Sequence, residues 1–308
     1  MSLPTHISRR AALTGAAALP LAASLTTPAR AGAPMMGASQ ANFKRVTLGG
    51  FEVTNLLAGS AVREDPQSIF GMNVDQATFE AASAEARLPT DKTQFFFTPV
   101  VVNTGAELVL FDTGLNPAGT LSALEAAGYT ADQVDKVIIT HMHGDHIGGL
   151  QTDGTPTFAN AEHVAGAVEM NHWSGAGNER FDGIVRPLMD KFTMVDDGAS
   201  VASGITAMAA FGHTPGHMIY MIESDGAQLL LGADFANHFV WSLGYPDWEV
   251  RFDMDKAAAA ATRRRLLDMM AVDGVPFTSY HMPWPAFGFV ETAGDGFRYI
   301  PHSYQLTM

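Results

Sequence analysis

Cysteine is absent from the 308 residues of this chain. Disulfide bonds, thiolate metal ligands and cysteine nucleophiles are therefore all excluded. Any metal ion must be held by nitrogen and oxygen donors, which come mainly from histidine, aspartate and glutamate side chains.

Positive charge and long apolar runs are also scarce. The chain has 18 lysine and arginine residues against 32 aspartate and glutamate residues, a formal net charge of −14. A nucleic-acid backbone or an anionic membrane surface requires a basic face, so neither is expected as a partner. After residue 31 no segment reaches the ~18 apolar residues of a membrane helix, so we expect no membrane insertion. The composition favours a small neutral hydrophobic molecule as the partner.

The first residues have the pattern of an export signal. Arg9 and Arg10 precede a weakly apolar run from Ala11 to Leu25, and Ala29-Arg30-Ala31 fits an A-x-A cleavage site. The paired arginines resemble the twin-arginine signal, which exports folded proteins. We therefore predict a signal peptide over residues 1–31, a periplasmic location, and a mature formal charge of −17 once Arg9, Arg10 and Arg30 are removed.

The rest of the chain alternates short apolar runs with helical segments. Residues 32–42 form a predicted linker and residues 43–308 a single predicted catalytic domain. The main expected strands are residues 44–57, 95–102, 107–111, 136–140, 157–164, 205–211, 217–224 and 228–231, and the main helices are residues 75–88, 118–127 and 255–270. Strands that alternate with helices, each followed by a polar residue, predict an α/β sandwich whose functional site lies along one sheet edge.

The stretch THMHGDHIGG, residues 140–149, holds the densest group of metal-binding side chains. His141 and His143 are two positions apart on extended chain, so they point the same way and can share one ion. Asp145 and His146 follow one turn later and project elsewhere. Because one tetrahedral ion cannot easily take all four, we predict two metal ions.

Further donors appear where later strands end. His213 lies in Gly212-His213-Thr214-Pro215-Gly216, Asp234 follows Gly232-Ala233, and His281 follows Tyr280. With Asp112-Thr113-Gly114 and the H-x-H-x-D-H motif, their order along the chain resembles metallo-β-lactamase-fold hydrolases. The resemblance covers almost the whole mature chain and implies a four-layer αβ/βα sandwich with a dinuclear metal centre.

The resemblance also implies how the ligands divide. His141, His143 and His213 would bind the first ion, Asp145, His146 and His281 would bind the second, and Asp234 would bridge both. We expect the two ions to be divalent and most often zinc, although mixed metals are compatible with the same donors. Two such cations would lower the pKa of a water that they share, so that a bridging hydroxide could attack an ester. Asp145 and Asp234 are the expected catalytic carboxylates. Asp112 would accept a hydrogen bond from a ligand histidine, although a turn-capping role is equally open.

Individual residues separate the branches of this family. The absence of cysteine excludes the β-lactamases with a thiolate ligand, and Asp234 argues against the remaining dinuclear β-lactamases. His143 stands where oxygen-reducing diiron relatives carry glutamate, so a diiron centre is disfavoured. A mononuclear iron dioxygenase would leave Asp145, His146 and His281 without a metal, so it ranks lower, as does a non-catalytic metal-binding relative. Glyoxalase II is disfavoured because Arg298 is the single basic residue after His281.

The remaining resemblance is to the methyl parathion hydrolase and N-acyl homoserine lactonase group, through the leader and residues 251–265. Such lactonases usually carry tyrosine three residues after the bridging aspartate, where this chain has Asn237. We expect a quorum-quenching lactonase or neutral-ester hydrolase, with an organophosphate triesterase as the alternative.

The substrate pocket is expected to be aromatic. Trp173, in a glycine-rich stretch that suggests a loop, Phe96 and His238 are the predicted substrate-binding residues, although core packing is the alternative for each. His163 is expected to serve packing, and His217 to support a ligand. Exposed aromatic residues and the habit of the family are compatible with a homodimer.

Overall fold

The computed structural model describes residues 35 and 37–304. The chain divides into two compact units after Gln40, and the fold below is that of the unit from Ala41 onward. Its first strand begins at Phe43, the residue at which the catalytic domain was predicted to begin. The predicted signal peptide, residues 1–31, lies outside the described residues. None of the described helices is both long enough and apolar enough to cross a bilayer.

A mixed sheet of seven strands forms the N-terminal half, in the order β1-β2-β5-β6-β7-β10-β11. Its strands are β1 (Phe43–Leu48), β2 (Phe51–Leu56), β5 (Val100–Asn103), β6 (Leu108–Phe111), β7 (Lys136–Ile139), β10 (Glu162–Gly166) and β11 (Phe192–Val195). Strands β6, β7, β10 and β11 run parallel, so their carboxyl ends lie at one edge. The predicted strand over residues 44–57 is a hairpin, because Gly49 and Gly50 form its turn.

A second seven-stranded sheet forms the C-terminal half, in the order β12-β13-β14-β15-β16-β17-β18. Its strands are β12 (Ser200–Ala202), β13 (Ile205–Ala209), β14 (Met218–Ser224), β15 (Ala227–Leu231), β16 (Phe277–Thr278), β17 (Phe287–Ala293) and β18 (Gly296–Pro301). Strands β17 and β18 were not predicted. They contain glycines and charged residues in place of a continuous apolar run, and their pairing across the hairpin stabilises them.

Two small ribbons complete the strands. The longer pairs β3 (Gly59–Glu64) with β4 (Lys92–Phe97), and the shorter pairs β8 (Gln151–Thr152) with β9 (Thr155–Pro156). The apolar run over residues 95–102, predicted as one strand, is divided between β4 and β5. Pro99, between them, lacks the N–H that a continuous ladder needs.

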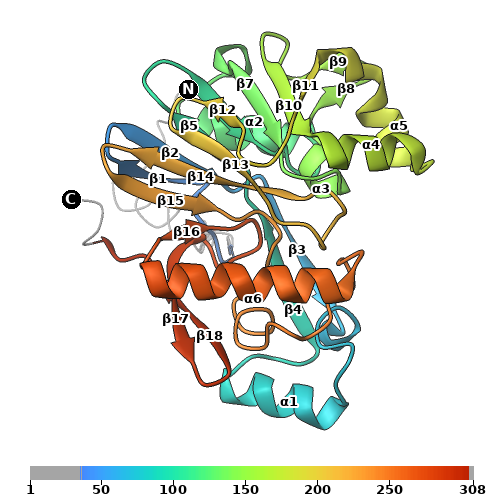
Figure 1. Ribbon diagram of the computed structural model, residues 1–308, viewed down its shortest axis with the longest axis vertical. Helices are drawn as coiled ribbons and strands as arrows, with labels where there is room; N and C mark the ends of the chain where they lie inside the picture. The colour runs from blue at the N-terminus through green and yellow to red at the C-terminus, as the bar shows by residue number, and fades with distance from the viewer. Residues whose placement is uncertain (1–34, 36, 305–308) are drawn as a thin grey trace, which may run out of the picture. The chain divides into compact units, whose positions relative to one another are not determined.

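The helices are α1 (Gln76–Glu85), α2 (Pro117–Ala126), α3 (Gly144–Ile147), α4 (Ala167–Gly175), α5 (Glu179–Ile184) and α6 (Lys256–Asp273), with three short 3-10 turns, η1 (Pro66–Ser68), η2 (Ala131–Gln133) and η3 (Arg186–Lys191). Helix α6 begins after Asp255, whose side chain accepts a hydrogen bond from the Ala258 N–H, and ends at Gly274 in the left-handed conformation. Figure 1 shows α6 lying along the second sheet, with α4 and α5 beside the first.

Three apolar cores show the layers. Leu110 and Ile139 of the first sheet pack against the helices on its outer face, and Phe111 and Ile138 pack inward against the second sheet. On the far side of the second sheet, Leu230 belongs to the core that α6 covers. Neighbouring strand residues thus face opposite layers, as the alternation of side chains in a strand requires. The predicted four-layer αβ/βα sandwich is confirmed.

Candidate metal centre

The histidine-rich turn follows the buried strand β7. Its first residue, Thr140, donates its N–H to Oδ1 of Asp112 at 2.9 Å, which fixes the turn to the end of β6. His143 then caps helix α3, so Asp145 and His146 lie within that single helical turn. The change from extended chain to helix is what turns the two halves of the motif in different directions.

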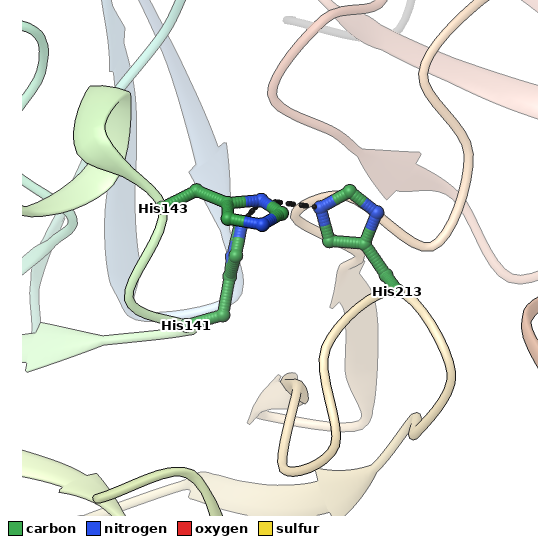
Figure 2. Close-up of side chains that lie close together, drawn as sticks. All are labelled: His141, His143 and His213. Carbon is green, nitrogen blue, oxygen red and sulfur yellow. Dashed lines mark hydrogen bonds between the residues drawn. The ribbon is translucent and has the colours of Figure 1, made fainter. Parts of the chain in front are cut away.

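Three ring nitrogens from two distant segments converge in the first group of donors. Nε2 of His141 lies 3.1 Å from Nδ1 of His143, and that atom lies 3.0 Å from Nε2 of His213. Figure 2 shows His213 approaching the pair from the opposite side. Three nitrogens so close together, with two of the rings fully or almost fully buried, form one face of a tetrahedral metal site.

A second group of donors lies beside the first. Oδ2 of Asp145 is 3.6 Å from Nε2 of His146 and 3.4 Å from Nε2 of His281. Asp234 lies between the two groups. Its Oδ2 is 3.4 Å from Nε2 of His213 and 3.2 Å from Nε2 of His281, whereas its Oδ1 is 3.4 Å from Nε2 of His146. The structure therefore brings together all seven residues predicted as ligands.

The outer nitrogens of the buried rings already have partners. Nδ1 of His146 lies 2.8 Å from Oδ2 of Asp112, and Nδ1 of His281 donates to the Phe96 carbonyl at 2.8 Å. In the neutral form of each ring these contacts place the proton on the outer nitrogen, so that the inner lone pair is directed at the centre. Nε2 of His146 and Oδ1 of Asp234 are buried and have no hydrogen-bond partner among the described residues. Such orphaned donors fit two divalent metal ions.

The pKa shifts of the donors differ between the first and the second group. Burial, reinforced by His213, lowers the pKa of His143 to about 3, and burial also lowers the pKa of His141, so these two rings are neutral. Burial also disfavours a charged His281, but the carboxylates of Asp234 and Asp145 outweigh it and raise its pKa to about 10. Burial would raise the pKa of Asp145, but His146 and His281 hold it at about 2. The second group thus attracts cations.

Asp253 and Arg263 support the first group, and neither was predicted to do so. Oδ1 of Asp253 lies 2.8 Å from Nδ1 of His213, and Oδ2 accepts from Nη2 of Arg263 at 2.7 Å. The Arg263 side chain is fully buried and donates to the backbone carbonyls of Phe235 and Pro246. Both residues lie in the stretch 251–265, which in the sequence served only as a sign of family resemblance. Their supporting role was missed because the sequence does not show that Arg263 is buried.

Glu169 was also missed. Its carboxylate is fully buried on α4 and accepts from the Met142 N–H at 2.9 Å, within the histidine-rich turn. Its other oxygen accepts from Oγ1 of Thr214 at 2.7 Å and from the Gly216 N–H at 2.8 Å. Glu169 therefore connects the two loops that carry the first group of donors. No motif marks it in the sequence.

Asp234 has polar neighbours of its own. Nδ2 of Asn237 donates to Oδ2 of Asp234 at 3.0 Å, and the Asp234 N–H donates to Nε2 of His217 at 3.1 Å. Asn237 is almost fully buried, so it acts on the carboxylate and not on solvent. His217 holds the backbone of a predicted ligand residue, in keeping with the supporting position expected for it.

A cavity of about 280 Å³ opens onto both groups of donors. Its apolar lining comprises Phe95, Phe97, Leu115 and Phe252. Arg63 and Arg180 also line it, and neither pairs with a carboxylate in the part of the chain described. We call this space the metal cavity.

The three predicted substrate-binding residues lie elsewhere. Trp173 is on helix α4 and not in a loop, and it is 7% exposed because its indole packs in the core and donates from Nε1 to Glu169. The glycines that suggested a loop follow the helix. Phe96 and His238 do not line the metal cavity but a second one, because Phe96 faces the side of β4 opposite to Phe95. These three side chains therefore do not line the metal cavity, and their part in substrate binding stays a prediction.

Comparison with known proteins gives consistent matches. The family model of the metallo-beta-lactamase superfamily matches residues 98–274. The solved structure of AidC, described as a dizinc quorum-quenching lactonase in complex with a product, is 26% identical with a TM-score of 0.80, over 85% of this chain and 98% of AidC. The hydrolase AbOPH, described as in the beta lactamase superfamily, is 23% identical with a TM-score of 0.80, over 87% of this chain and 99% of its own, and shows the same fold.

A curated relative matches over a shorter stretch. The uncharacterized protein YobT of Bacillus subtilis is 25% identical over 155 residues, which cover 46% of this chain and 66% of YobT. The chain thus spans somewhat less than two thirds of that relative.

Proposed function

The chain belongs to the metallo-beta-lactamase superfamily, whose family model matches more than half of it, and on that premise we propose that it is a dinuclear metallohydrolase. Its proposed substrates are lactones, N-acyl homoserine lactones among them, or other neutral hydrophobic esters. The observation that carries this proposal is the position of Asp234 between the two groups of donors: its Oδ2 lies near His213 of the first group and His281 of the second, and its Oδ1 lies near His146 of the second. The likeness to AidC, described as a dizinc lactonase, supports the choice of lactones.

We propose that the donors divide between two ions as the family resemblance implies. In this proposal His141, His143 and His213 hold one ion, Asp145, His146 and His281 hold the other, and Asp234 contacts both. Two bound divalent ions, for which we propose zinc, would polarise the ester carbonyl oxygen and would lower the pKa of the attacking water. The same donor set also accepts mixed metals.

The protein side chains orient the substrate and move the proton. The apolar wall of Phe95, Phe97 and Phe252 holds the hydrophobic part of the ester and excludes water from the reacting bond. Asp145 and Asp234 both line the cavity. We assign the proton transfer to Oδ1 of Asp234, which has no hydrogen-bond partner among the described residues. It would take the proton that the attacking water loses and pass it to the leaving alkoxide.

A phosphotriesterase is the second candidate, and Asn237 favours it. N-acyl homoserine lactonases of this fold usually place a tyrosine there to bind the substrate carbonyl or leaving group, whereas the buried Asn237 amide is engaged with Asp234. Phenolate leaving groups of aryl phosphotriesters leave without a proton, so they do not need that tyrosine. A mononuclear iron dioxygenase ranks below both, because it would leave the second group of donors unused.

A substrate panel tests the proposal. Initial rates are measured for N-acyl homoserine lactones of several chain lengths, δ-lactones, neutral aryl esters and an aryl phosphotriester, and compared as kcat/KM. The Asp234→Asn variant serves as the background control, because it retains the shape of the site but loses the shared charge. The proposal requires a lactone or carboxylic ester to have the highest kcat/KM, and a preference for the phosphotriester, or full activity in Asp234→Asn, would contradict it.

Location and partners are part of the same proposal. We propose export to the periplasm by the twin-arginine-type signal, where opening of acyl homoserine lactones would quench quorum signals before they enter the cell. The low content of basic residues supports a small neutral substrate and no nucleic acid. A homodimer is proposed as the assembly.

A further inference from the structure

A second cavity of about 360 Å³ lies beside the metal cavity. We call it the ribbon cavity, because the β3–β4 ribbon forms one wall. Its lining is mainly apolar and includes Val62, Leu88, Phe96, Phe239, Trp241 and Pro283. Three polar residues of β4 also line it, Lys92, Thr93 and Gln94. The two cavities share a single lining residue, His281.

Strand register places the two cavities on opposite faces of the ribbon. In β3, Arg63 lines the metal cavity and the adjacent Val62 lines the ribbon cavity. In β4, Phe95 and Phe97 line the metal cavity and Phe96 lines the ribbon cavity. Because side chains alternate along a strand, the ribbon separates the two spaces, so a ligand can occupy the ribbon cavity without reaching the metals.

His238 supplies one oriented polar group in this apolar lining. Its Nδ1 accepts the N–H groups of Val240 and Trp241, each at 3.1 Å, and its ring stacks on the Trp241 indole with centroids 4.0 Å apart. Since Nδ1 is an acceptor, the proton is on Nε2, which has no partner among the described residues. Burial lowers the pKa of His238 to about 3, so the ring is neutral. The ribbon cavity thus presents a buried, fixed N–H donor from His238, whereas the donors of Lys92 and Gln94 belong to exposed side chains.

We infer that the ribbon cavity is a second ligand site for a neutral, mainly apolar molecule that has one acceptor oxygen, such as an aryl or alkyl ketone. Its apolar body contacts Phe96 and Trp241, and its oxygen accepts from Nε2 of His238. A neutral occupant is favoured, because the buried part of the lining is apolar apart from Thr93 and the two histidines, and the charge of Lys92 lies on an exposed side chain.

The occupant also touches the wall of the metal site. His281 lines both cavities, and its Nδ1 donates to the carbonyl of Phe96, which lines the ribbon cavity. A molecule bound there therefore contacts the segments that orient a predicted metal ligand while leaving the metal cavity open. We expect it to change kcat and to leave the KM of the ester unchanged.

The test uses the metal-loaded full-length protein and the neutral fluorescent ketone 6-propionyl-2-(dimethylamino)naphthalene. Val62→Asp places a charge at the rim of the ribbon cavity, where Val62 is already 52% exposed, so the fold should survive. Val272→Asp, at an 82% exposed position on α6 outside both cavities, is the matched control. Binding is followed by the blue shift of the probe and by quenching of tryptophan emission, and folding of each variant by circular dichroism.

We expect saturable binding of about one probe per chain, weakened about tenfold or more by Val62→Asp and unchanged by Val272→Asp. The probe should not compete with an ester substrate. Lack of saturable binding, equal binding to both variants, or purely competitive inhibition of ester hydrolysis would each overturn the inference. If Val62→Asp does not fold, Leu88→Ala, which removes apolar contact from the same cavity, gives the same comparison. Binding remains measurable if the enzyme has a different substrate, so failure of this inference is distinct from failure of the proposed function.

Discussion

Asp253 accepts a hydrogen bond from His213 through one oxygen and pairs with the buried Arg263 through the other, at 2.8 and 2.7 Å. The arginine balances the charge of a carboxylate that would otherwise be costly to bury. Through this pair, helix α6 fixes the ring of His213, the member of the first group that follows a strand of the second sheet.

Replacement of Asp253 by asparagine should weaken the first metal site. The amide can direct its NH₂ group at Nδ1 of His213 and so favours the wrong tautomer, and supporting residues of this kind typically change metal affinity about 10–100-fold. Competition with a chelating dye measures the affinity. Asp255→Asn is the control, because asparagine caps helix α6 as well as aspartate does. Equal affinity in the two variants would contradict the role given to Asp253.

Replacement of Glu169 by glutamine should loosen both loops of the first group. The carboxylate accepts from Met142, Thr214 and Gly216, as well as from the Trp173 indole, and the NH₂ group of glutamine would face some of these donors. We expect a loss of about 1–3 kcal/mol in the free energy of unfolding, measured with urea on the metal-free protein. The exposed Glu162→Gln should change little. A Glu169→Gln variant with normal stability and metal content would show that this connection is dispensable.

Arg180 should hold the carboxylate that ester hydrolysis produces. Its guanidinium lies against Gly144, so closely that a Cβ added there would be 2.5 Å from Nε, and it lines the metal cavity with no carboxylate partner in the described chain. Arg180→Gln should raise the inhibition constant of the hydroxy-acid product about tenfold, the value of one charge-assisted hydrogen bond. Arg186→Gln is the control, since Arg186 pairs with Asp182 outside the cavity. Unchanged product inhibition in Arg180→Gln would exclude this contact.

His163 should make the fold sensitive to acid. Both ring nitrogens are buried without partners in the described structure, and burial lowers its pKa to about 4, below the ordinary 6.5. Between these values the unfolded chain binds the proton and the folded chain does not, so stability is complete above pH 6.5 and falls as the pH decreases toward 4.

The variant His163→Phe should therefore gain stability over the natural protein more at pH 5 than at pH 7.5. Urea unfolding at both pH values measures the difference, and His172→Phe, at a half-buried position of α4, is the comparison. A gain of equal size at both pH values would mean that His163 does not titrate in this range.

Much of the metal centre was predictable, because it depends on local patterns. The spacing of His141 and His143 after an apolar strand already indicates a shared ion, and Asp145 and His146 follow within one helical turn. The strand ends that carry His213 and Asp234 are marked by short apolar runs followed by glycine. These signals come from residues near one another in sequence.

The supporting residues depend on long-range packing and could not be predicted in this way. Asp253 reaches His213 across 40 positions, and Glu169 reaches Thr214 across 45. Nothing in the sequence around either residue specifies the partner. The lining of the metal cavity could not be predicted for a related reason, since a shift of one residue along β4 moves a side chain from one cavity to the other, as Phe95 and Phe96 show.

The metal content of the natively purified protein tests the central claim most directly. Elemental analysis by mass spectrometry, with protein concentration from amino-acid analysis, gives equivalents per chain. Because two groups of donors share Asp234, the account predicts about two equivalents of divalent metal, mainly zinc. One equivalent of iron per chain, with no second metal taken up on incubation with zinc, would contradict it.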